Sequence, residues 1–126
     1  MLFRSVGDLC VRNGQPQVKP SDIMTQAIIE ISEKMLGAAA VIDNDKLVGI
    51  VTDGDLRRML MKHPNIEAVK VSDIMTKNPT TIEKSAHVAD AINIMQSNEI
   101  SVLPVLENGK YVGMIHIHDI IKEGII

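Results

Sequence analysis

Residues 27–56 read AIIEISEKMLGAAAVIDNDKLVGIVTDGDL, and a similar pattern recurs without a gap at residues 91–120, AINIMQSNEISVLPVLENGKYVGMIHIHDI. Upstream, VGDLC at 6–10 resembles VSDIM at 71–75, with one extra residue in the first copy before the two longer stretches align. Two copies of one supersecondary unit are therefore predicted. We expect one copy in 1–64 and the other in 65–126. Identical residues in the long stretches are Ala27/Ala91, Ile28/Ile92, Val41/Val105, Asn44/Asn108, Lys46/Lys110, Val48/Val112, Gly49/Gly113 and Asp55/Asp119.

Each copy is predicted to be a β-α-β-β-α unit. In the first copy, apolar residues at helical spacing between 24 and 35 indicate an amphipathic helix, which Ser21 or Asp22 could begin and Gly37 could end. The segments AAAVID and KLVGIVT, and their counterparts SVLPVLE and KYVGMIH, read as two hairpins with Asn or Gly in the turns. The second strand of each hairpin runs into a short helix. The expected fold is α/β (α+β), with the copies related by a pseudo-twofold axis.

Composition limits the classes of function. Hydrophobic residues make up 45% of the 126 residues but aromatic residues only 2%, so the core must be aliphatic. A net charge of −3 and the scarcity of aromatic side chains argue against nucleic-acid binding. Cys10 is the only cysteine and is expected in the core. No apolar stretch approaches the roughly 20 residues of a membrane span, so we expect a cytoplasmic protein. The methionines expected in the core include Met24, Met35, Met59, Met95 and Met114.

The segment GIVTDGDLRR, residues 49–58, places a cluster of polar residues where a strand ends and a helix begins. Free N–H groups and the helix dipole favour an anion there. Thr52 or Asp53 could cap the helix, while the Thr52 hydroxyl and the Asp55 carboxylate could hold a phosphate and a ribose diol. Gly49 would let backbone or ligand come close. Plain capping is the alternative, but the repeat of Asp55 at 119 favours binding, for which the Asp55 carboxylate should lie near the surface.

Together with VSDIMTKNPTTI at 71–82, SVLPV at 101–105 and the G-x-x-T-x-x-D pattern that ends at Asp55, the repeat resembles a tandem pair of CBS domains, a Bateman module. The resemblance implies a regulatory unit that binds a nucleotide or nucleotidyl ligand in the cleft between the copies and commonly dimerises. Thr52 and Asp55 match phosphate and ribose contacts of that family. In the second copy Asp119 matches, but His116 replaces the threonine. The candidate ligand-binding residues are Gly49, Thr52, Asp53, Asp55, Arg57, Met75, Thr76, Asn78, Pro79, Thr80, Ser101, Pro104, Gly113, His116, His118 and Asp119.

A narrower resemblance comes from TDGDLRR at 52–58, VSDIMT at 71–76 and HIHDIIKEGII at 116–126. These segments are similar to the CBS tail of bacterial D-arabinose 5-phosphate isomerases of capsule and lipopolysaccharide (Kdo) synthesis, whose catalysis lies in a sugar-isomerase (SIS) domain. The sequence lacks that domain, so we expect a regulatory part of such an enzyme. Feedback logic suggests a nucleotide or nucleotide-sugar effector such as CMP-Kdo. The alternatives are an adenine-nucleotide sensor of another enzyme or transporter, and a purely structural dimerisation module.

Other residue patterns give weaker indications. His116 and His118 alternate as metal ligands can, but only Asp119 offers a third ligand, so no metal is predicted. Arg57 and Arg58 are either solvated or recruited by a ligand anion or by an acidic neighbouring chain. No Ser/His/Asp or Cys/His arrangement indicates a catalytic nucleophile, so the chain is predicted to be neither an enzyme by itself nor a cofactor carrier. Apolar helix faces at 59–61 and 120–121 predict a homodimer.

Overall fold

The compact units of the structure have different boundaries from the sequence repeat. The computed structural model describes residues 5–11, 13–63 and 65–122; Pro64, at the expected boundary between the copies, lies outside them. The "first-copy unit" consists of Pro16–Pro79, and the "second-copy unit" of Met1–Gln15 together with Thr80–Ile126. Each unit therefore contains a segment that the repeat assigns to the other copy.

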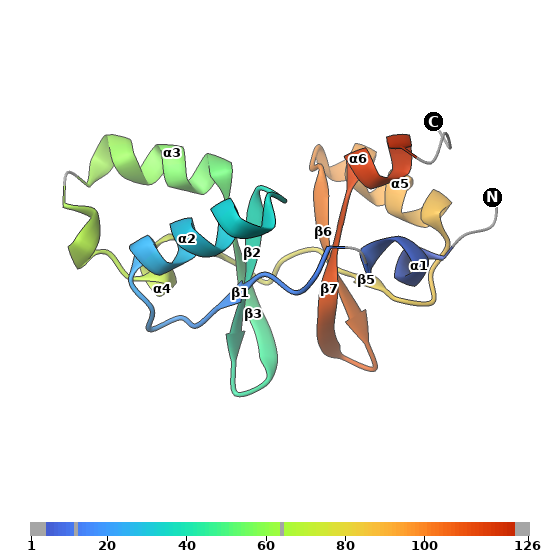
Figure 1. Cartoon of the computed structure of the whole chain (residues 1–126), viewed down its shortest axis with the longest axis horizontal. Coiled ribbons are helices and arrows are strands. Elements are labelled where there is room, and N and C mark those ends of the chain that lie inside the picture. Colours follow the sequence, from blue (N-terminus) through green and yellow to red (C-terminus); the bar gives the residue numbers. More distant parts are fainter. Residues whose placement is uncertain (1–4, 12, 64, 123–126) are drawn as a thin grey trace. The chain divides into compact units, whose positions relative to one another are not determined.

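The first-copy unit has a four-stranded sheet in the order β1-β2-β3-β4 (Figure 1). β1 pairs with β2 in parallel, whereas β2 and β3, and β3 and β4, are antiparallel. The expected β-α-β-β-α order is present, and a short helix and an edge strand follow it. The elements are β1 (Gln17–Val18), α2 (Met24–Lys34), β2 (Ala38–Asp43), β3 (Lys46–Thr52), α3 (Asp53–Lys62), a 3-10 turn (Ile66–Ala68), α4 (Val71–Ile74) and β4 (Thr76–Lys77).

The second-copy unit has a three-stranded sheet in the order β5-β6-β7. Its N-terminal helix is attached by two backbone hydrogen bonds, from Val6 N to the Ala86 carbonyl and from Gly7 N to the Lys84 carbonyl, both 2.9 Å long. The mixed α/β fold class is confirmed in both units. The elements are α1 (Val6–Cys10), β5 (Ile82–Glu83), α5 (Val88–Asn98), β6 (Val102–Glu107), β7 (Lys110–His116) and α6 (Ile117–Lys122).

The two predicted hairpins form with two-residue turns. Both central residues have positive φ, 51° and 65° at Asn44 and Asp45 and 53° and 81° at Asn108 and Gly109. Left-handed residues at both positions match the twist of the flanking strands, and Asn, Asp and Gly adopt that conformation at least cost. The turns thus fix the register that carries β3 and β7 to Thr52 and His116.

The long helix of the first copy begins and ends at other residues than expected. Its N-cap is Ile23, with no side-chain cap, because the Asp22 carboxylate instead accepts from Lys19 N at 2.8 Å. Its C-cap is Met35 in the left-handed region, not Gly37. This conformation turns Met35 away from the core, leaving it 86% exposed, so its predicted burial is wrong.

Aliphatic side chains form the core of each unit, as the composition predicts. The other four methionines predicted in the core are buried, and so is Cys10, whose thiol donates to the Gly7 carbonyl. Burial raises the pKa of that thiol, which keeps it protonated and unreactive. The buried methionines are Met24, Met59, Met95 and Met114.

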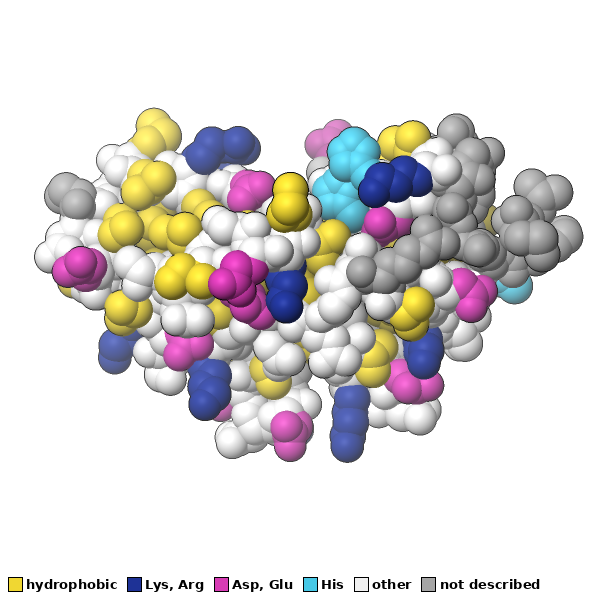
Figure 2. Space-filling view, in the orientation of Figure 1, with side chains coloured by type: hydrophobic (Ala, Val, Ile, Leu, Met, Phe, Trp, Pro, Cys, Tyr) yellow, Lys and Arg dark blue, Asp and Glu magenta, His cyan; other side chains and the backbone are white. Residues whose placement is uncertain are grey.

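Exposed apolar side chains lie on the last helix of each unit. On α3, Met59 is buried, but Leu60 and Met61 are 57% and 86% exposed; on α6, Ile120 is buried and Ile121 is 48% exposed. One residue of each predicted apolar face is therefore buried within its own unit, and only Leu60, Met61 and Ile121 remain exposed. Hydrophobic side chains also show at the surface over α2 and α3 (Figure 2). None of the helices in the described part of the chain combines the length and hydrophobicity needed to cross a bilayer.

Candidate functional site

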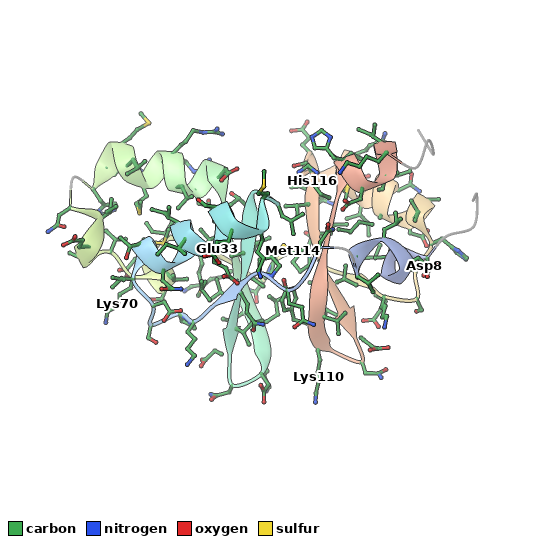
Figure 3. The ribbon with its side chains drawn as sticks, viewed as in Figure 1. Asp8, Glu33, Lys70, Lys110, Met114 and His116 are labelled. Carbon is green, nitrogen blue, oxygen red and sulfur yellow. The ribbon has the colours of Figure 1, made fainter. Side chains whose placement is uncertain are left out.

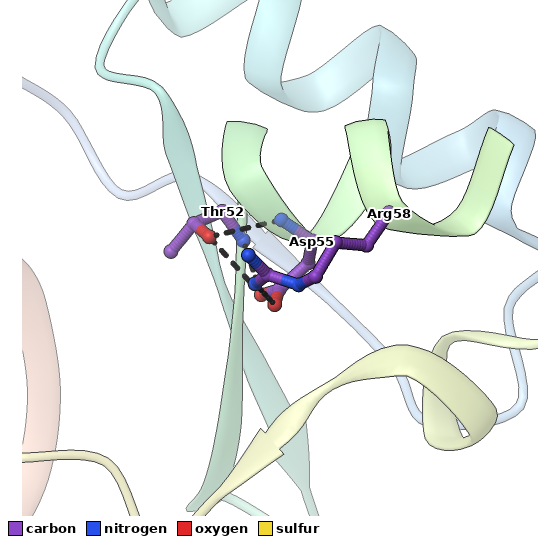
Figure 4. A network of polar contacts seen from close by, with 3 residues as sticks. All are labelled: Thr52, Asp55 and Arg58. Carbon is purple, nitrogen blue, oxygen red and sulfur yellow. Dashed lines mark hydrogen bonds and ion pairs between the residues drawn. The ribbon is translucent and has the colours of Figure 1, made fainter. Parts of the chain in front are cut away.

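The junction between β3 and α3 is a capping box built from Thr52 and Asp55 (Figure 4). The Thr52 hydroxyl accepts from Asp55 N at 3.3 Å, and the Asp55 carboxylate accepts from Thr52 N at 2.9 Å and from the Thr52 hydroxyl at 3.1 Å. Capping of the α3 N-terminus therefore accounts for the presence of both Thr52 and Asp55 at this junction. Asp55 is only 7% exposed, which contradicts the expectation of a carboxylate near the surface. Its burial follows from its place at the third position of α3, turned back toward the strand.

Arg58 completes this cluster. One guanidinium nitrogen donates to the second oxygen of the Asp55 carboxylate at 2.6 Å, and the two side chains are 66% and 8% exposed, respectively. Arg57, which was included among the candidate ligand-binding residues, is exposed on the same helix. Arg58 was not among the candidates, although its i,i+3 spacing from Asp55 is a sequence signal that could have identified it.

The junction between β7 and α6 repeats this backbone arrangement with other side chains. The Asp119 carboxylate accepts from His116 N at 2.8 Å, as Asp55 does from Thr52 N. Its side-chain partner is Asn13, whose amide donates to Asp119 at 2.8 Å and to the Met114 carbonyl on β7 at 2.9 Å. Met114 and His116 are labelled in Figure 3. Asn13 was missed, although the repeat pairs it with Asn78, which was a candidate.

His116 replaces the threonine in function as well as in position. Its Nδ1 atom accepts from His118 N at 3.0 Å, so the imidazole caps the first turn of α6. The two rings are stacked, with centroids 4.8 Å apart. Burial, and next the nearby His118, lower the pKa of His116, while Asp119 opposes this shift. Among the residues that the structure describes, no group of three or more His, Cys, Asp or Glu side chains is placed to hold a metal ion.

Gly49 and Gly113 are needed because the chain itself approaches them closely. A Cβ atom on Gly49 would lie 2.9 Å from the Thr76 carbonyl oxygen and 2.8 Å from the Met75 sulfur. On Gly113 it would lie 3.2 Å from the Gly14 carbonyl oxygen. Gly49 was expected to let either backbone or ligand come close, and in the structure it is the backbone of β4 that does so.

The other candidate residues lie at the two strand-to-helix junctions or on the segments that surround them. Gly49, Met75 and Thr76 come together where β4 pairs with β3, and Asp53 donates its N–H to the Gly37 carbonyl at the start of α3. In the second-copy unit, the Ser101 carbonyl accepts from Ile117 N in the equivalent way. The remaining candidates lie on connections and strands: Asn78 and Pro79 after β4, Thr80 before β5, and Pro104 buried on β6.

A surface hollow of about 900 Å³ lies at the opposite end of β3 from Thr52. It is lined by residues 17–22 and 42–45, so it belongs to the hairpin turn and β1. Its Asp22 carboxylate is already bonded to the Lys19 N–H. None of the candidate ligand-binding residues lines this hollow.

Comparison with protein families gives matches over most of the chain. The CBS domain model matches residues 6–62 and 71–125. Among curated proteins, arabinose 5-phosphate isomerase KdsD of Francisella tularensis is 42% identical over 111 residues, covering 87% of this chain and 34% of that protein. The chain spans about a third of the length of the curated relatives it matches.

Solved structures agree with this assignment. A CBS-domain containing protein from Agrobacterium tumefaciens superposes with a TM-score of 0.84 at 27% identity, over 96% of this chain and 99% of that one. CBSX2, solved in complex with AMP, has a TM-score of 0.77 at 28% identity, over 95% of each chain.

Proposed function

Because this chain belongs to the CBS domain family, we propose that it is a regulatory module that binds a nucleotide or nucleotide sugar through its Thr52–Arg58 junction. The observation that carries the proposal is the cluster of Thr52, Asp55 and Arg58 at the start of α3. It combines a hydroxyl, a shielded carboxylate and a cation, the last supplied by the second turn of the helix.

Each group has a part of the ligand that it suits. The start of α3 favours a phosphate through the positive end of the helix dipole, and the Arg58 guanidinium favours it through its N–H donors and its charge. The Asp55 carboxylate accepts hydrogen bonds only, so it suits the two hydroxyls of a ribose. The Thr52 hydroxyl, which donates to Asp55 in this structure, can instead donate to a phosphate oxygen or to a ribose oxygen. A ribose phosphate is the ligand fragment that uses all three.

We expect the whole protein to be an arabinose 5-phosphate isomerase in which this module senses a product of the pathway. The support is the identity to the KdsD proteins, which extends over 87% of this chain in Francisella tularensis. CMP-Kdo is the leading effector on feedback logic, and it carries a ribose phosphate. AMP is the second candidate, since CBSX2 was solved with it.

Calorimetric titration of AMP, ATP, CMP and CMP-Kdo into the chain tests the proposal. Saturable binding of a cytidine ligand alone would support the pathway effector, and binding of AMP or ATP alone would support an adenine-nucleotide sensor. Asp55→Asn should weaken whichever binding occurs, with the exposed Asp53→Asn as the matched control. If no nucleotide binds to the folded protein, the module is structural and the proposal fails.

A further inference from the structure

The Asp55 carboxylate has little accepting capacity left in this structure. One of its oxygens takes both the N–H and the hydroxyl of Thr52, and the other takes Arg58. A carboxylate offers about four lone-pair positions, so about one is free. A ribose diol needs two acceptor positions. Arg58 must therefore leave Asp55 before both ribose hydroxyls can bind there.

Arg58 is placed to leave. Its side chain is 66% exposed whereas the Asp55 side chain is 8% exposed, so solvent competes for the arginine half of the pair. The guanidinium lies over the first turn of α3, where a Cβ on Gly54 would be 3.4 Å from one of its nitrogens. A phosphate bound at that turn would come within its reach. Arginine forms paired hydrogen bonds to phosphate as readily as to carboxylate, so the exchange replaces one charged partner by another.

We propose that Arg58 makes ribose binding at Asp55 conditional on a phosphate, so that the junction selects nucleotides over nucleosides. This inference rests on the proposed function. A phosphate draws Arg58 away from Asp55 and frees the carboxylate for the sugar. A neutral nucleoside must break the ion pair without offering the guanidinium a new anion.

The second copy lacks this coupling at its equivalent aspartate. Asp119 is bonded to the neutral amide of Asn13, which also holds the Met114 carbonyl. An amide anchored in this way gains nothing from a phosphate. We therefore expect the junction at Asp55, and not the junction at Asp119, to discriminate between nucleotides and nucleosides.

Calorimetry with matched pairs, adenosine with AMP and cytidine with CMP, tests the inference in wild type, Arg58→Met and Lys62→Met. Lys62 supplies the control because it is a cation on the same helix, near its far end. We expect Arg58→Met to bind nucleoside about two- to fivefold more tightly, since the competing ion pair is gone. It should bind the monophosphate about tenfold more weakly, because a charge-assisted contact is lost.

The decisive quantity is the ratio of monophosphate to nucleoside affinity. It should collapse in Arg58→Met and stay near wild type in Lys62→Met, while far-UV circular dichroism shows both variants folded. If wild type binds a monophosphate but Arg58→Met weakens nucleoside and monophosphate equally, or neither, Arg58 is no selector and the inference is overturned while the proposed function stands. If wild type binds no member of either pair, the inference fails, and the proposed function fails with it only if ATP and CMP-Kdo do not bind either. Should Arg58→Met not fold, Arg58→Lys, which keeps the charge but loses the planar fork, must show the same fall in ratio to a smaller extent.

Discussion

Replacing Asp55 separates its role as a helix cap from its role in binding. Asp55→Ala removes the acceptor for Thr52 N and the partner of Arg58. The N-cap Thr52 remains, so loss of the Asp55 half of the capping box costs about 0.5–1.5 kcal/mol, and loss of an ion pair whose arginine is exposed adds at most about 1 kcal/mol. We therefore expect the free energy of unfolding to fall by about 0.5–2.5 kcal/mol.

Asp55→Asn keeps the shape and one acceptor oxygen, so Thr52 N can remain bonded while the charge is lost. We expect this variant to lose about half as much stability as Asp55→Ala. Binding of a nucleotide should nevertheless weaken by one to two decades, because a hydrogen bond to a charged group contributes about 1.5–3 kcal/mol. The exposed Asp53, also in the first turn, serves as control: Asp53→Asn removes the same charge at a cost of less than about 1 kcal/mol.

Urea melts followed by far-UV circular dichroism give the stabilities, since the chain has no tryptophan for fluorescence. Calorimetry with the nucleotide that wild type binds gives the affinities. The reasoning is refuted if Asp55→Asn binds that nucleotide as wild type does while Asp55→Ala is destabilised, because Asp55 would then be a cap alone. It is also refuted if Asp55→Ala is as stable as Asp53→Asn, because the capping box would then contribute nothing.

Three other predictions follow from individual contacts. Gly49→Ala should lower stability by about 1–3 kcal/mol in urea melts, because its Cβ would lie 2.9 Å from a β4 carbonyl oxygen; Gly54→Ala, whose Cβ would come no closer than 3.4 Å to the mobile end of Arg58, should be neutral or stabilising. The lowered pKa of His116 means that its neutral, capping form is favoured by folding, so stability should be full above the ordinary pKa of 6.5 and fall as pH drops below it; His116→Asn should flatten that dependence in melts between pH 5 and 8. The exposed Leu60 and Met61 should support a homodimer, so light scattering should give twice 13.8 kDa for wild type and a smaller mass when both are changed to Ser.

The sequence predicted the hairpins and the helices that follow them because these depend on local chemistry. The Asn44 and Asn108 turns have the residues that positive φ demands, and the repeat aligned them. Boundaries set by competing local contacts were less predictable. Asp22 is a good N-cap by type, but its carboxylate accepts from Lys19 N, and the N-cap is the next residue, Ile23.

The site was predictable in its positions and less so in its contacts. Thr52 and Asp55 were identified from the pattern, but the spacing alone could not decide between capping and binding, and the contacts show capping. Arg57 was chosen as a candidate in place of its neighbour Arg58, because the sequence does not say which of the two side chains turns back toward Asp55. Asn13 lies more than 100 residues from Asp119 in sequence, so only the fold brings them together.

The exchange of segments between the copies explains why the two junctions differ although their backbones match. In the second-copy unit, the segment after α1 reaches β7 and supplies Asn13 to Asp119. In the first-copy unit, the equivalent segment after α4 pairs with β3 as β4, and its Asn78 is exposed. Asp55 is thereby left to an arginine of its own helix, whose side chain is 66% exposed, whereas Asp119 is held by an asparagine that is also bonded to β7. The repeat therefore contains one aspartate with a solvent-exposed, charged partner and one with a neutral partner anchored to its sheet, and only the charged partner offers the exchange with a phosphate that we propose.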